Sequence, residues 1–172
     1  KMGKELRVDT WIEPLKSPFG TIRSFLGYAG DKLCAKGITK WVLLDVTTGR
    51  PSKIEADLIE RYTVNEGSAF EGSKIEKITE PENYTSETEI LVRRTDIDWN
   101  NHVHNLTYLD YALETIPQDV YDKMDFTKIR ISYKSAVKQS DKIVCKYAFV
   151  NEKHIVNIFD QNNELKTAIE LS

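Results

Sequence analysis

A single helical pattern stands among many strand-like stretches, and this contrast most constrains how the chain can fold. One stripe of that helix carries large apolar residues: Leu106, Leu109, Leu113 and Ile116. Tyr108, Tyr111 and Ala112 make most of the remaining circumference apolar as well. Because a helix that is apolar nearly all round is normally buried, the sequence predicts an α+β fold in which an antiparallel sheet wraps one long central helix.

Apolar side chains recur at every second position in most other stretches, which is typical of β-strands. The predicted strands cover residues 5–13, 22–28, 33–46, 90–92, 129–137, 143–149, 154–160 and 165–171. Residues 33–46 are apolar on both faces, which favours a central strand. Short helical turns are expected at 54–62 and 119–124, and Gln161–Asn163 has the composition of a hairpin turn.

Residues 63–86 divide the chain, because they are rich in Glu, Gly, Ser and Pro and show no steady period. We expect a linker there, with an edge segment around 74–78. Residues 1–62 would form a partial N-terminal domain of strands only, and residues 87–172 a C-terminal domain that carries the polar loop. The last three strands resemble the first three in length and turns, which indicates an internal repeat. The first copy lacks a leading strand, loop and helix, so we expect the printed chain to start inside a larger protein.

Composition excludes some classes of protein. The 172 residues carry a formal net charge of −3, which argues against a nucleic-acid partner. No apolar run approaches the roughly 20 residues of a membrane span. Cys34 and Cys145 lie in strand-like runs, where buried, reduced thiols are expected, and a cytoplasmic location follows from that expectation.

Short polar side chains crowd the segment between the strand at 90–92 and the helix. In extended backbone the alternate residues Asp98, Asn100 and His102 would project to the same side, where they could activate a water molecule. Purely structural roles stay open for three of these residues. Asp96 and Asp98 could be loop or cap residues, and Asn105 could cap the helix. His102 and His104 could bind a metal ion, but no third ligand is evident, and His154 is interpreted as a surface residue.

Residues 93–114 resemble the acyl-acyl-carrier-protein (acyl-ACP) thioesterases of the hot-dog fold. The second domain of that family carries Asp-x-Asn-x-His-Val-Asn-Asn followed by Tyr, and here the same run is Asp98 to Asn105 followed by Tyr108. The first half is also similar to that family, at Val8–Trp11 and in the run from Lys40 to Pro51. The resemblance implies a tandem double hot-dog fold whose first repeat is incomplete.

Two departures from the family pattern bear on the mechanism. The first Asn after His-Val is His104, and the family's downstream Glu-Cys pair aligns with Ala136 and Val137. A cysteine nucleophile therefore has no support, and a catalytic carboxylate role falls to Asp98. The resemblance implies hydrolysis of a fatty-acyl thioester on the phosphopantetheine arm of acyl carrier protein, with no metal and no cofactor.

The resemblance also assigns expected roles. Asp98 would orient or deprotonate water, Asn100 would hold the water or the carbonyl, and His102 would transfer a proton to the leaving thiolate. Substrate would be bound at Val103, His104, Asn105 and Tyr108, with backbone N–H groups of 103–105 stabilising the oxyanion. The lysine-rich region 123–146 could dock an acidic carrier protein. A homodimer stays open; neither a nucleic acid nor a membrane is expected as a partner.

Two other functions remain possible on the sequence alone. One is an acyl-coenzyme A thioesterase that uses the same loop. The other is a hot-dog domain that binds acyl chains or assembles subunits without catalysis, which the loss of the Glu-Cys pair keeps open.

Overall fold

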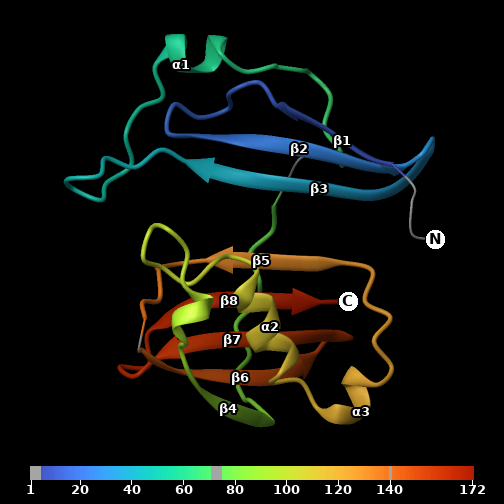
Figure 1. Cartoon of the computed structure of the whole chain (residues 1–172), viewed down its shortest axis with the longest axis vertical. Helices are drawn as coiled ribbons and strands as arrows, with labels where there is room; N and C mark the ends of the chain where they lie inside the picture. The colour runs from blue at the N-terminus through green and yellow to red at the C-terminus, as the bar shows by residue number, and fades with distance from the viewer. Residues whose placement is uncertain (1–4, 71–74, 140) are drawn as a thin grey trace. The chain divides into compact units, whose positions relative to one another are not determined.

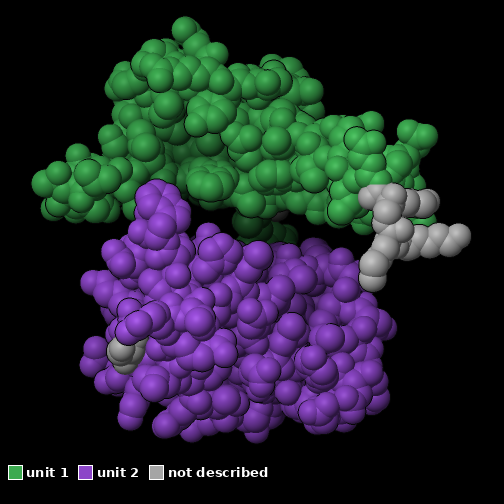
Figure 2. All heavy atoms as spheres, viewed as in Figure 1, with its two compact units in different colours: residues 1–76 green, residues 77–172 purple. Residues whose placement is uncertain are grey.

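The computed structural model describes residues 5–70, 75–139 and 141–172. These residues form two compact units, Lys1–Glu76 and Lys77–Ser172, which Figure 2 colours separately. The boundary between Glu76 and Lys77 falls within the segment at 63–86. Each unit is described by itself below.

Unit 1 is a three-stranded antiparallel meander (Figure 1). It consists of β1 (Leu6–Ile12), β2 (Gly20–Ala29) and β3 (Lys32–Val42), followed by a short helix α1 (Ala56–Glu60). The β2–β3 turn contains Gly30 at φ +62, a left-handed conformation that glycine adopts at no steric cost. The predicted strands and the short helix are confirmed.

The prediction of a central third strand is wrong, because β2 lies in the middle and β3 at one edge of the described sheet. Apolar residues on both faces of a stretch indicate a central strand only if both faces are covered. Here Trp41 and Val42 are 58% and 46% exposed, and Leu43 is also exposed. Their apolar character marks an open surface rather than a buried strand.

Unit 2 has the predicted order of strand, helix and four strands. Its elements are β4 (Ser86–Leu91), a 3-10 turn η1 (Arg94–Asp96), α2 (Thr107–Leu113), α3 (Gln118–Tyr121), β5 (Ile129–Tyr133), β6 (Lys142–Val150), β7 (Lys153–Asp160) and β8 (Leu165–Leu171). The strands form one antiparallel sheet in the order β4-β6-β7-β8-β5. The predicted turn at Gln161–Asn163 is confirmed: Asp160 Oδ1 accepts the N–H groups of Asn162 and Glu164, both at 2.9 Å.

The hydrophobic core lies between one face of this sheet and α2, which crosses it in Figure 1. The expected burial of the helix is confirmed only in part. Tyr108, Tyr111 and Ala112 are buried, whereas Leu106 is 67% exposed and Leu109 only half-buried. The tyrosines can face the core because their hydroxyls find hydrogen-bond partners there. The helix is also short, at seven residues.

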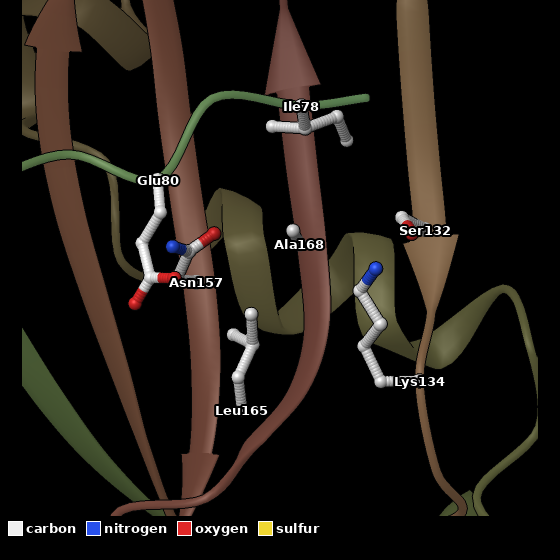
Figure 3. Close-up of a pocket in the computed structure, with 7 residues that line it drawn as sticks. All are labelled: Ile78, Glu80, Ser132, Lys134, Asn157, Leu165 and Ala168. Carbon is white, nitrogen blue, oxygen red and sulfur yellow. The ribbon is translucent and has the colours of Figure 1, made fainter. Parts of the chain in front are cut away.

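The opposite face of the sheet carries the segment that leads into β4. In that segment the Tyr84 hydroxyl accepts a hydrogen bond from Asn157 Nδ2 at 2.9 Å, and its ring packs edge-on against Phe159. Ile78 and Glu80 enclose a hollow of about 110 Å³ against the sheet (Figure 3). The expected edge segment at 74–78 begins outside the described residues, and residues 75–78 form no strand.

Among the described residues, no helix has the length and apolar character needed to cross a membrane.

Candidate active site

The polar loop of unit 2 closes into a tight turn. Ile97 and Val103 pair as an isolated antiparallel bridge, and the Asp98 N–H donates to the His102 carbonyl at 2.8 Å. Asn101 sits at φ +62, a left-handed conformation that asparagine tolerates better than most residues. The expectation of extended backbone, with alternate side chains on one side, is therefore wrong for this segment.

The Asp98 carboxylate holds this turn together from inside. Its Oδ1 accepts the backbone N–H groups of Asn100 at 2.8 Å and His102 at 3.2 Å. Short carboxylate side chains often satisfy the backbone of a turn in this way. The turn brings the three predicted residues together, and these backbone contacts agree with the alternative interpretation of Asp98 as a loop or cap residue.

These contacts set the charge of Asp98. Partial burial alone would raise its pKa, but the backbone N–H groups of His102 and Asn100, the Asn100 side chain and the charge of His102 together hold the pKa below its usual value. Asp98 is therefore ionised at neutral pH. Such a carboxylate can orient a water molecule or stabilise a protonated imidazole next to it.

His102 is half-buried and Asn100 is exposed. The backbone N–H and carbonyl of His102 are both bound to Asp98, which fixes where the imidazole leaves the chain. Within the described part of the chain, the imidazole itself has no hydrogen-bond partner. It is available to a substrate.

Two of the three backbone donors expected to stabilise an oxyanion are already used. The Val103 N–H donates to the Val137 carbonyl at 2.9 Å, and the His104 N–H donates to the Asp96 carbonyl at 2.8 Å. Of the three, only the Asn105 N–H has no hydrogen-bond acceptor among the described residues. The helix-start interpretation also changes: Nδ1 of His104, not the side chain of Asn105, accepts the Leu106 N–H at 3.3 Å.

Asp96 is the residue at this site that the sequence analysis undervalued. It is 3% exposed, and its carboxylate accepts hydrogen bonds from Arg93 and from the Tyr111 hydroxyl. The sequence did hold a signal for this role, namely the spacing Arg-x-x-Asp at Arg93 and Asp96 shortly after a strand. At that spacing the two side chains can cap a turn, as they do here. Burial alone would raise the pKa of Asp96, but the hydrogen bonds from Arg93 and Tyr111 lower it.

This lowered pKa predicts how stability depends on pH. A carboxyl group whose pKa is lower in the folded state stabilises the fold above its unfolded pKa of about 4 and loses that contribution as the pH falls through the folded pKa. Urea unfolding at pH 7 should show Asp96→Asn less stable than the wild type. The difference in free energy of unfolding between the two proteins should narrow below about pH 4. A difference that does not change with pH would contradict an ionised Asp96.

Comparison with known proteins decides the family. The family model of the acyl-ACP thioesterase C-terminal domain matches residues 72–171. The chain belongs to the acyl-ACP thioesterase family. The match covers all of the polar loop and nearly all of unit 2.

Two curated plant proteins are among the relatives that this chain resembles. Oleoyl-acyl carrier protein thioesterase 1, chloroplastic, from Arabidopsis thaliana is 28% identical over 153 residues, which is 82% of this chain and 42% of that protein. Palmitoyl-acyl carrier protein thioesterase, chloroplastic, from the same plant is 27% identical over 77% of this chain and 34% of that protein. The chain thus spans less than half the length of these relatives.

Solved structures of acyl-ACP thioesterases have the same hot-dog fold. The 12:0-ACP thioesterase from Umbellularia californica matches with a TM-score of 0.86 at 18% identity, covering 99% of this chain and 68% of that one. An acyl-ACP thioesterase from Bacteroides thetaiotaomicron matches with a TM-score of 0.80 at 20% identity, covering 96% and 67%. The hot-dog fold expected from the sequence is confirmed.

In this member of the acyl-ACP thioesterase family, Val137, expected to match the Cys of the Glu-Cys pair, has a structural role, whereas Ala136 is exposed. Val137 is 1% exposed; its carbonyl anchors Val103, and its N–H donates to the Tyr108 hydroxyl at 3.2 Å. Burial raises the pKa of Tyr108, so its hydroxyl stays neutral. Tyr108, expected to bind substrate, lies in the core against Tyr111 and Tyr133.

Neither cysteine of this acyl-ACP thioesterase chain offers a ready nucleophile at the site. Cys145 is buried in the core as expected, and burial raises its pKa to about 12, which keeps it a thiol. Cys34 was expected to be buried but is exposed in unit 1. His154, expected at the surface, is half-buried, and its Nδ1 lies 2.8 Å from the Tyr147 hydroxyl.

Proposed function

We propose that the chain hydrolyses fatty-acyl thioesters carried by acyl carrier protein and releases the free fatty acid. The observation that carries the proposal is the turn in which an ionised Asp98 carboxylate binds the backbone of His102, in the loop that carries the family motif. Family membership supports the substrate class. Thioester carbonyls are electrophilic, so positioned water and proton transfer are sufficient for the chemistry.

The reaction divides among the residues of the turn. Asp98, assisted by the Asn100 amide, orients a water molecule; as the water oxygen attacks the carbonyl carbon, the His102 imidazole takes up the proton that the water loses. The Asn105 N–H stabilises the oxyanion of the tetrahedral intermediate, a contact worth about 3 kcal/mol in comparable sites. The C–S bond then breaks, and His102 passes a proton to the thiolate.

An apolar pocket of about 370 Å³ in unit 1 supports binding of an acyl chain. It is lined by β-sheet and α1 residues that include Ile12, Trp41, Ile54, Leu58 and Tyr62. Pockets of this size and character are typical sites for apolar ligands. We assign this apolar pocket to the fatty-acyl chain and not to the acyl carrier protein.

Charge supports docking of a carrier protein on unit 2. Lys134, Lys138 and Lys142 are exposed and have no ion-pair partner among the described residues. Such cations raise the association rate of an acidic partner. We also propose a cytoplasmic location. The proposed domain boundary within 63–86 is supported by the division of the chain into compact units between Glu76 and Lys77.

Comparison of two substrates tests the proposed function. With one acyl chain presented on carrier protein and on coenzyme A, we expect kcat/KM to be at least about tenfold higher for the carrier, because an acidic protein surface can meet several exposed lysines at once, whereas the phosphates of coenzyme A reach fewer of them. Higher activity on coenzyme A would assign the chain to the rival thioesterase class. Binding of acyl chains without release of fatty acid would assign it a non-catalytic role.

A further inference from the structure

The buried carboxylate of Asp96 joins three parts of unit 2 that the proposed mechanism does not otherwise connect. From the end of β4, the Arg93 backbone N–H donates to Oδ2 at 2.8 Å, and the Arg93 guanidinium donates to Oδ1 at 2.8 Å from Nη2 and 3.1 Å from Nε. From α2, the Tyr111 hydroxyl donates to Oδ2 at 2.8 Å. Both carboxylate oxygens are therefore held from two directions.

The backbone of Asp96 supports the other end of the loop. Its carbonyl accepts the N–H of His104 at 2.8 Å, directly after the turn closes. Asp98 begins the turn two residues after Asp96, and His102 ends it two residues before His104. The turn that carries the proposed catalytic groups is thus framed by one buried residue.

Burying this carboxylate costs free energy, because an ionised group loses its hydration on burial. An apolar residue could fill the same space without that penalty. A carboxylate with fixed donors differs from an apolar residue in that it defines one geometry, since its hydrogen bonds are directional. A reaction that depends on the placement of Asp98 and His102 requires that the loop carrying them keep one fixed geometry.

We propose that Asp96 is a positioning residue that, held by Arg93 and Tyr111, fixes the Asp98–His102 turn in the geometry needed for thioester hydrolysis. The inference rests on the proposed function. Asp96 itself does not touch the substrate; it acts through the turn. Its loss should therefore lower kcat and leave KM nearly unchanged, because binding of the acyl chain and carrier does not depend on the turn.

Steady-state kinetics with oleoyl-acyl carrier protein as the probe test this. Asp96→Asn in the full-length protein should lower kcat by roughly 100-fold, the loss expected when reacting groups are displaced by about 1 Å, with KM changed less than about threefold. Arg93→Lys keeps the charge but loses the two-pronged contact, and should lower kcat by a smaller factor. Because the Arg93 side chain is 70% exposed, that variant will fold even if Asp96→Asn does not.

Asp119→Asn is the matched control, since Asp119 is an exposed carboxylate on α3 with no hydrogen bond to the loop. It should retain wild-type kcat and KM. Hydrogen exchange of the peptide covering 96–105 provides a readout independent of catalysis. Exchange in that peptide should be faster in Asp96→Asn and Arg93→Lys than in the wild type and in Asp119→Asn.

The two readouts separate the two claims. Unchanged kcat and unchanged exchange in folded Asp96→Asn, or in Arg93→Lys if Asp96→Asn fails to fold, would overturn the positioning role. So would a loss expressed mainly in KM. If the wild type releases no fatty acid, the proposed function fails, and the exchange measurement still decides whether Asp96 holds the turn.

Discussion

Replacing His102 with alanine should lower kcat for acyl-carrier-protein hydrolysis by roughly 10²- to 10⁴-fold, the usual contribution of a positioned proton-transfer group. The imidazole has no hydrogen-bond partner among the described residues, so its removal leaves no donor unsatisfied in the turn. The turn itself depends on the His102 backbone, which alanine retains. Rates of fatty-acid release with saturating substrate measure the effect.

The matched control is His154→Ala, a histidine of the same unit whose Nδ1 lies beside the Tyr147 hydroxyl rather than in the turn. It should keep kcat within about threefold of the wild type, because only groups at the reacting atoms contribute to proton transfer. Equal losses in the two variants would indicate a general effect on folding. Wild-type turnover in His102→Ala would remove the assignment of His102.

Ile116→Ala should destabilise unit 2 by about 2–5 kcal/mol, because Ile116 is 6% exposed and packs in the core beside α2. Leu106→Ala should change the free energy of unfolding by less than about 0.5 kcal/mol, because Leu106 is 67% exposed. Urea unfolding of both variants measures the difference.

This pair tests how the two ends of the apolar stripe pack, because Leu106 comes directly before α2 and Ile116 comes after it. The apolar stripe seen in the sequence assigns Leu106 and Ile116 to the same face and therefore predicts similar costs for both. The structure predicts very different costs. Similar values for the two variants would contradict the exposure of Leu106 and the burial of Ile116.

The sequence predicted the fold better than the details of packing. Period-two stretches located the strands of both units, because alternation follows from the geometry of a strand. The order of strands in space needed the structure: residues 33–46 are apolar on both faces, yet β3 lies at an edge. The helix was expected to be buried nearly all round; the structure buries Tyr108, Tyr111 and Ala112, but a helix that is apolar on most sides does not reveal in its sequence which side meets the core.

The candidate site was predicted in part. Family resemblance located Asp98, Asn100 and His102, and the structure brings them into one turn. The loop or cap role left open for Asp98 agrees with its bonds to backbone N–H groups, but the sequence could not say which N–H groups it binds, because every residue of the loop carries one. The same limit applies to the oxyanion donors at 103 and 104, whose N–H groups bind the carbonyls of Val137 and Asp96, which come from other parts of the fold.

Fatty-acid release by Asp98→Asn tests the central claim most directly. The asparagine side chain keeps an oxygen that can accept the N–H groups of Asn100 and His102, so the turn is retained while the negative charge is lost. The account predicts a folded protein with wild-type hydrogen exchange in 96–105 and a kcat lower by roughly 100-fold or more. Turnover of oleoyl-acyl carrier protein at the wild-type rate would contradict it.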